Sequence, residues 1–172
     1  VRGCIYLLRD PRDVVISYSK FIGSSIDETI NRMAEPNRQI YNQEKTVGII
    51  LSRWDYHITS WLKLNSPKII IKYEDLLTNT EKVINELINF LKNTLKIDLK
   101  INKNKIAHII ETTSFKKLKQ KEEDEGFIEA SKKSKFFRSG TSLQWKTELK
   151  SDQIEKIERN FQDLMKKFNY LN

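Results

Sequence analysis

The feature that most constrains this fold is a short apolar run at residues 5–8, followed at once by a helix-start signal. A run of this length, closed by polar residues, is typical of a buried β-strand. Asp10 is a preferred N-cap residue, and Pro11 suits the first turn of a helix. The sequence therefore predicts a strand, a tight turn and a helix, which together form the first element of an α/β fold.

A second buried strand is predicted at residues 69–71, three consecutive isoleucines that follow Pro67. Apolar residues spaced by three and four predict helices over residues 47–62 and 83–91. Both strands are thus followed by helices, as right-handed βαβ crossovers require. The expected fold class is α/β, a P-loop-like parallel sheet flanked by helices.

Two further helices are expected. Ser25 and Glu28 stand three apart, as in a capping box, and predict a short helix over residues 25–34. Ser151 opens a final helix, whose apolar stripe is expected to dock on the sheet. Between the second strand and this last helix, residues 116–135 are dominated by Lys and Glu, which indicates a mobile, solvated surface segment or lid.

The length of 172 residues suits one domain, residues 1–172, and 31 Lys and Arg against 23 Asp and Glu give a net charge of +8. Such an excess of positive charge favours an anionic partner. The candidates are nucleic acid, an acidic lipid surface and a small phosphorylated ligand. The single cysteine, Cys4, excludes an internal disulfide and indicates a reducing, cytoplasmic location. His57 and His108 lack partners at ligand spacing, so no metal is expected, and no apolar stretch is long enough for a membrane anchor.

Arg9 and Ser17 are the first candidates for a binding site. Arg9 follows the first strand, and in open α/β sheets ligands bind at the carboxyl ends of the strands. The N-terminus of the next helix favours anions, and the guanidinium of Arg9 matches phosphate oxygens. Taken alone, these residues fit equally well a surface on which Arg9 pairs with Asp10 or Asp13 and Ser17 is merely exposed.

A small basic turn at residues 138–141, Arg-Ser-Gly-Thr, is the second candidate. Gly140 permits a close approach of the backbone to an anion. The sequence contains neither a complete dinucleotide-binding glycine motif nor a complete phosphate loop. By itself the turn is better explained as an ordinary surface turn.

Together these segments resemble the family of sulfotransferases that use 3′-phosphoadenosine 5′-phosphosulfate (PAPS). Residues 8–17, Leu-Arg-Asp-Pro-Arg-Asp-Val-Val-Ile-Ser, are similar to the family's 3′-phosphate motif. The resemblance implies that Arg9 and Ser17 both contact that phosphate. Residues 137–146 resemble the family's R-[KS]-G-x-x-G-x-W-[KR] loop, which implies that Arg138 and the backbone amides of Ser139 and Gly140 close over the same phosphate.

Two other segments carry the resemblance to the adenine side. Residues 73–76 match the family's Y-E-D-L strand end, which implies that Tyr73 lies near the adenine. Residues 113–115, Thr113, Ser114 and Phe115, match its T-S-F turn, which implies that the phenylalanine stacks on the base. The helix over residues 53–61 resembles the family's S-W-x-x-H-x-x-x-W helix, which is structural.

The chain departs from the family pattern in two places. Leu143 and Gln144 replace a glycine and its polar neighbour in the last loop. The family's K-S-G-T-type loop for the 5′-phosphosulfate and its usual catalytic histidine precede the motif at Arg9, so both are expected upstream of Val1. We therefore assign no catalytic residue within residues 1–172, and we expect this chain alone to be inactive.

The resemblance implies transfer of a sulfuryl group from PAPS to an acceptor hydroxyl or amine, with a small molecule or glycan as acceptor. Two alternatives stay open. The first is a nucleic-acid-binding module, suggested by the net charge and by lysines near aromatic residues, although the acids at 122–125 make a solvated lid the simpler explanation. The second is a non-catalytic binder of adenosine 3′,5′-bisphosphate.

Overall fold

The computed structural model describes residues 2–40, 49–128, 130 and 134–171. The chain divides into two compact units. Unit 1 comprises Val1–Arg9 and Asn65–Ser142, and unit 2 comprises Asp10–Leu64 and Leu143–Asn172. Each unit is therefore built from two stretches of sequence.

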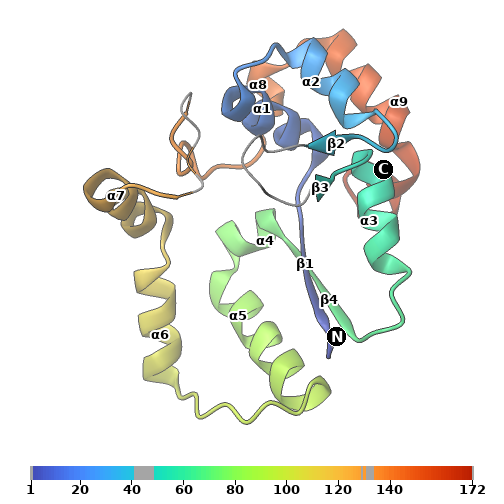
Figure 1. The fold of residues 1–172 in the computed structure, drawn as a ribbon. Helices are drawn as coiled ribbons and strands as arrows, with labels where there is room; N and C mark the ends of the chain where they lie inside the picture. Colours follow the sequence, from blue (N-terminus) through green and yellow to red (C-terminus); the bar gives the residue numbers. More distant parts are fainter. Residues whose placement is uncertain (1, 41–48, 129, 131–133, 172) are drawn as a thin grey trace. The chain divides into compact units, whose positions relative to one another are not determined.

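A two-stranded parallel sheet organises unit 1 (Figure 1). Strand β1 (Cys4–Leu8) pairs with β4 (Lys68–Lys72), with Cys4 opposite Lys68 and Leu8 opposite Lys72. Both predicted strands and their parallel pairing are confirmed. Leu8 and Ile71 are buried, whereas Ile5 and Leu7 are 50% and 57% exposed, so one face of β1 stays open to solvent.

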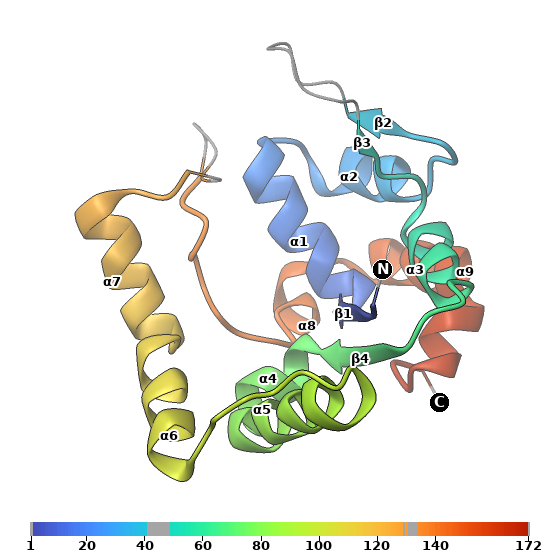
Figure 2. The same ribbon diagram turned by 60° about the horizontal axis from the view of Figure 1, so that its bottom comes forward.

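Helices follow β4 directly in unit 1. Figure 2 shows α4 and α5 lying next to β4. Val83 on α5 and Phe90 just after it are buried, which confirms the predicted helical stripe. The elements after β4 are α4 (Tyr73–Thr78), α5 (Thr80–Asn89), the π-helical turn η1 (Phe90–Thr94), α6 (Lys103–Thr112) and α7 (Phe115–Glu125).

Unit 2 begins with the two helices whose caps the sequence predicted. Helix α1 (Pro11–Ile22) has Asp10 as its N-cap, accepting a hydrogen bond from the Arg12 N–H, and Pro11 in its first turn. Helix α2 (Ile26–Met33) starts with the capping box of Ser25 and Glu28. The remaining elements of this unit are β2 (Gln39–Ile40), β3 (Ile49–Ile50), α3 (Trp54–Leu62), α8 (Trp145–Glu148) and α9 (Ser151–Lys167).

The core of unit 2 lies between α1, α2 and α9. Its buried side chains come from all three helices and from Leu149, which follows α8: Val15, Ile16, Ile30, Met33, Leu149, Ile157, Phe161 and Met165. We expected the last helix to dock on the sheet. Instead, the apolar stripe of α9 packs on α1 and α2, and α3 also packs against α9. An amphipathic stripe specifies only an apolar partner surface, not which element supplies it.

The helix predicted over residues 47–62 is shorter than expected. Ile49–Ile50 instead form β3, which runs antiparallel to β2. The backbone N–H groups of Leu51 and Ser52 both donate to the Arg38 carbonyl, and Ser52 has a positive φ of 56°. This turn prevents the helix from starting before Trp54, and Val47 lies outside the described residues.

The charged segment after Phe115 is also more ordered than the sequence suggested. Residues Phe115–Glu125 form helix α7, and Glu122, which was expected in a solvated run, is only 8% exposed. Residues 129 and 131–133 of the predicted lid lie outside the described residues.

Across the part of the chain that the structure covers, no helix is both long and apolar enough to cross a bilayer.

Candidate functional site

The register of the sheet brings the first two predicted site residues together. Leu8 lies opposite Lys72 at the carboxyl ends of β1 and β4, so the next residues, Arg9 and Tyr73, leave the sheet side by side. The Arg9 guanidinium lies 4.4 Å from the centre of the Tyr73 ring. A strand-end arginine and a strand-end tyrosine thus form one cation–π pair at the sheet edge where ligands bind.

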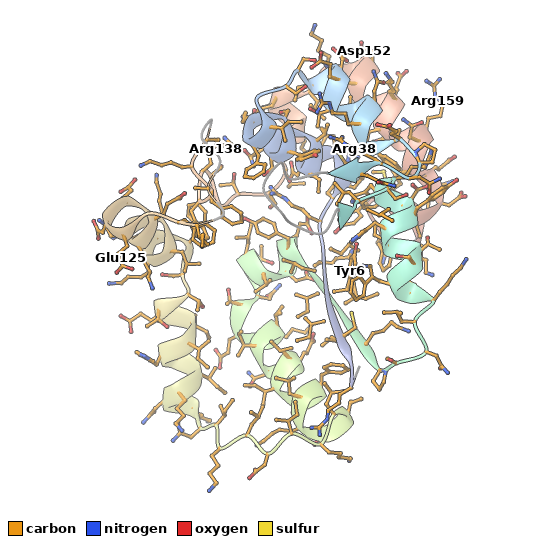
Figure 3. The ribbon with its side chains drawn as sticks, in the orientation of Figure 1. Tyr6, Arg38, Glu125, Arg138, Asp152 and Arg159 are labelled. Atoms are coloured by element: carbon orange, nitrogen blue, oxygen red, sulfur yellow. The ribbon has the colours of Figure 1, made fainter. Side chains whose placement is uncertain are left out.

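Arg9 also holds the basic turn. Its Nη2 donates a hydrogen bond of 2.9 Å to the Thr141 carbonyl, 132 residues away in sequence. The hydroxyl groups of Ser139 and Thr141 are 2.6 Å apart, within hydrogen-bond distance. The turn is therefore anchored to the sheet edge, and Figure 3 shows Arg138 on this segment after α7.

Gly140 packs against the ring of Phe115. Its φ is +65°, and a Cβ atom at this position would lie 2.4 Å from two ring atoms of Phe115. Only glycine fits both the left-handed backbone and this contact. Phe115 also lies edge-on to Phe137, with ring centres 6.2 Å apart. We call Arg9, Tyr73, Phe115, Gly140 and Thr141 the Arg9 cluster, since these contacts link them into one set within unit 1.

The other predicted residues differ in their placement. Thr113 is exposed at the end of α6, and its hydroxyl donates to the Ile109 carbonyl at 2.6 Å. Ser114 is the N-cap residue of α7 without a side-chain capping bond. The contact of the T-S-F turn with the basic turn therefore runs through Phe115 alone. Ser17 is an exposed residue of α1 and belongs to unit 2.

The chemistry of the Arg9 cluster, taken together with Arg138 and Ser139 of the basic turn, suits an anion next to a flat ring. Arg9 and Arg138 supply guanidinium groups, Ser139 and Thr141 supply hydroxyls, and Gly140 leaves backbone accessible. Tyr73 and Phe115 supply aromatic faces. Among the residues that the structure describes, no group of three His, Cys, Asp or Glu side chains is placed to hold a metal ion.

Sequence reasoning included Thr141 in the basic turn but missed the bond between its carbonyl and Arg9, and it missed the part that Asp13 plays. Asp13 is fully buried in unit 2, and its carboxylate accepts hydrogen bonds from the N–H groups of Leu143 at 2.7 Å and Trp145 at 3.0 Å. This carboxylate fixes the backbone of the segment after the basic turn. Its place in the Arg-Asp-Pro-Arg-Asp run was the only available signal.

Arg12, the second arginine of that run, is structural. It is 5% exposed, pairs with Asp10 at 2.7 Å and Glu158 at 2.6 Å, and donates to the Tyr170 carbonyl at 2.9 Å. Its guanidinium lies 3.8 Å from the centre of the Trp145 ring. Burial lowers the pKa of Arg12, but its hydrogen bonds to Asp10 and Glu158 outweigh that effect and raise the pKa above its ordinary value.

Leu143 occupies the position where the family pattern has glycine, and its φ is +62°. The Asp13 carboxylate thus holds a leucine in the left-handed region, which costs about 1 to 2 kcal/mol for a residue with a Cβ atom. We expect the free energy of unfolding of Leu143→Gly to exceed that of Leu143→Ala by up to about 1 kcal/mol, because only glycine relieves this strain. The greater conformational entropy of glycine in the unfolded chain offsets part of the gain. Urea denaturation of both variants measures the difference, and an alanine variant as stable as the glycine variant would argue against strain here.

Comparisons with known proteins place this chain in a family. The model of the sulfotransferase domain family matches residues 4–169. Sulfotransferase 2A1 of Macaca fascicularis is 26% identical over 171 residues, covering 94% of this chain and 55% of its own length. Luciferin sulfotransferase of Photinus pyralis is 28% identical over 164 residues, covering 90% of this chain and 42% of its own length.

Solved structures show the same fold. Mouse sulfotransferase SULT7A1, complexed with PAP, has a TM-score of 0.68 and 19% identity, with 94% of this chain and 57% of that chain covered. Retinol dehydratase, in complex with androsterone and the inactive cofactor PAP, has a TM-score of 0.66 and 20% identity, with 94% and 47% covered. The chain thus spans about half the length of the proteins it matches. With the family model matched from residue 4 to residue 169, this chain belongs to the sulfotransferase domain family.

Proposed function

We propose that this chain holds the nucleotide of PAPS, and that the whole protein transfers the sulfuryl group to a hydroxyl or amine of a small-molecule or glycan acceptor. The observation that carries the proposal is the Arg9 cluster. One guanidinium contacts the strand-end tyrosine and also holds the basic turn through Thr141. These contacts join three of the segments that resemble the family's nucleotide-contacting motifs, residues 8–17, 73–76 and 137–146.

The residues present fit such a nucleotide. A 3′-phosphate requires charged donors, and within unit 1 Arg9, Arg138 and Ser139 would contact it through guanidinium, hydroxyl and backbone N–H groups. The adenine requires flat apolar faces, and Tyr73 and Phe115 would supply them, with Thr113 and Ser114 forming the turn that precedes the phenylalanine. Residue 140 has to be glycine for Phe115 to keep this position, because a Cβ atom there would lie 2.4 Å from the ring.

PAPS, when bound, supplies the activated sulfuryl group. The part of this chain is to hold the nucleotide at its 3′-phosphate end and so orient the reacting end, which is a positioning contribution to catalysis. Solved relatives in complex with PAP, which is adenosine 3′,5′-bisphosphate, support this role.

We propose further that residues 1–172 belong to one domain that lacks the loop for the 5′-phosphosulfate. The chain spans 55% of the length of Sulfotransferase 2A1, and no Lys-Ser-Gly-Thr run occurs in its sequence. The general base and that loop would then lie in the part of the family fold that this chain does not span. The relatives' names, among them 3-beta-hydroxysteroid sulfotransferase of Cavia porcellus, support a small-molecule alcohol as acceptor. The single cysteine, Cys4, supports a cytoplasmic location.

A transfer assay tests the proposal. The product of the complete gene, incubated with sulfur-labelled PAPS and a panel of sterols, phenols and sugars, is expected to label at least one acceptor. The 172-residue chain alone is expected to label none, because it holds the nucleotide without the groups at the reacting end. Failure of the complete product on every acceptor, despite tight binding of adenosine 3′,5′-bisphosphate, would favour a non-catalytic binder. Equal turnover by both would place catalytic groups within these residues.

A further inference from the structure

Glu122 is a buried carboxylate that the proposed site does not yet explain. It is 8% exposed, although it stands in a run of four acidic residues on α7 whose other members, 123–125, are exposed. An ionised carboxylate taken out of water is costly unless hydrogen-bond donors surround it. The contacts of Glu122 therefore indicate what holds it inside.

Both carboxylate oxygens of Glu122 accept backbone hydrogen bonds from consecutive residues. The Phe136 N–H lies 2.6 Å from Oε1, and the Phe137 N–H lies 2.8 Å from Oε2. Two bonds from one rigid carboxylate fix the orientation of two successive peptide planes. The next residue along the chain is Arg138, whose own N–H donates to the Phe136 carbonyl at 3.0 Å.

Aromatic packing supports the same segment from another side. The Phe137 ring lies 6.2 Å from the Phe115 ring and 5.3 Å from the Phe127 ring, centre to centre. Phe115 in turn contacts Gly140. The residues on both sides of Arg138 and Ser139 are thus held, by Glu122 at Phe136 and Phe137 and by the Arg9 cluster at Gly140 and Thr141.

We propose that Glu122 is a positioning residue for the basic turn, fixing the backbone from which Arg138 reaches the 3′-phosphate. This inference rests on the proposed function, since it assigns a role toward the nucleotide of that same site. Glu122 itself does not contact the phosphate. Its carboxylate orients the donor residue, so its loss changes recognition of the 3′-phosphate more than recognition of the rest of the nucleotide.

The test compares Glu122→Gln with the matched control Glu123→Gln. Glutamine keeps the shape of the side chain but presents an amide NH₂ to one of the two backbone donors, so one bond is lost. Glu123 is the exposed neighbour and pairs with Lys135 at 3.0 Å. Calorimetry measures the affinity of each variant for adenosine 3′,5′-bisphosphate and for adenosine 5′-monophosphate, which lacks the 3′-phosphate. Amide hydrogen exchange follows the N–H groups of Phe136 and Phe137.

We expect Glu122→Gln to speed exchange at Phe136 and Phe137 and to weaken binding of the bisphosphate about five- to tenfold, with the monophosphate unchanged. Glu123→Gln should alter neither. If Glu122→Gln loses affinity equally for both nucleotides, or loses none, the inference about Glu122 is overturned. The proposed function is still upheld in that case, provided that the unaltered chain binds the bisphosphate. No bisphosphate binding by the unaltered chain would overturn both.

If Glu122→Gln does not fold, Glu122→Asp replaces it. Aspartate keeps the charge but withdraws both oxygens by one methylene group, so it cannot reach both N–H groups from the same backbone position. The expected result is the same selective loss for the bisphosphate. Unchanged selectivity in this variant would overturn the inference.

Discussion

Replacing Arg12 with alanine is expected to lower the free energy of unfolding by roughly 3 to 5 kcal/mol. The substitution removes the ion-pair partner of the buried Asp10 carboxylate, which is 3% exposed. It also removes the bond to Glu158 and the stacking on Trp145. Arg12 connects α1 to α9 and to the segment at Trp145, so unit 2 loses several contacts at once.

Lys20→Ala is the matched control for this prediction. Lys20 also forms an ion pair on α1, with Glu148, but both side chains are more than one-third exposed. An exposed pair contributes less than about 1 kcal/mol, because water solvates and screens both charges. Urea denaturation followed by circular dichroism compares the two variants. A loss for Arg12→Ala no greater than that for Lys20→Ala would contradict the structural role of Arg12.

The sequence predicted best those features that depend on neighbouring residues. The N-cap at Asp10 and the capping box at Ser25 are local hydrogen-bonding patterns, and both are present. The two strands could be predicted because each apolar run is short, contains β-branched residues and is bounded by polar or turn residues, which together favour a strand over a helix. The helix over residues 47–62 was predicted too long, because apolar spacing does not reveal the turn that the Arg38 carbonyl makes with Leu51 and Ser52.

The site was predictable to the extent that a motif marks it. Arg9, Tyr73, Phe115 and Gly140 were all singled out from short motifs, and the structure joins them in one cluster. Nothing in the sequence distinguished Glu122 from the acidic residues after it, because burial is set by the tertiary fold. The roles toward a nucleotide remain predictions for all four of these motif residues, and equally for Ser17, Thr113, Ser114, Arg138 and Ser139.

Arg9→Ala is expected to weaken binding of adenosine 3′,5′-bisphosphate by roughly ten- to a hundredfold. Loss of a hydrogen bond to a charged group costs about 1.5 to 3 kcal/mol, which corresponds to that range. Part of the loss is indirect, because Arg9 also holds the Thr141 carbonyl at 2.9 Å. Arg9→Lys keeps the positive charge without the planar fork, so its affinity should lie between those of Arg9→Ala and the unaltered chain.

Recognition of the 3′-phosphate is tested most directly by titration calorimetry of the unaltered chain and of Arg9→Ala with two nucleotides. One is adenosine 3′,5′-bisphosphate, and the other is adenosine 5′-monophosphate. We expect the affinity of the unaltered chain to be at least about tenfold higher for the bisphosphate than for the monophosphate, because only the bisphosphate carries the 3′-phosphate that Arg9 would bind. Arg9→Ala should lose most of this preference while its affinity for the monophosphate hardly changes. Equal affinity of the unaltered chain for both nucleotides would contradict the assignment of these residues to the 3′-phosphate.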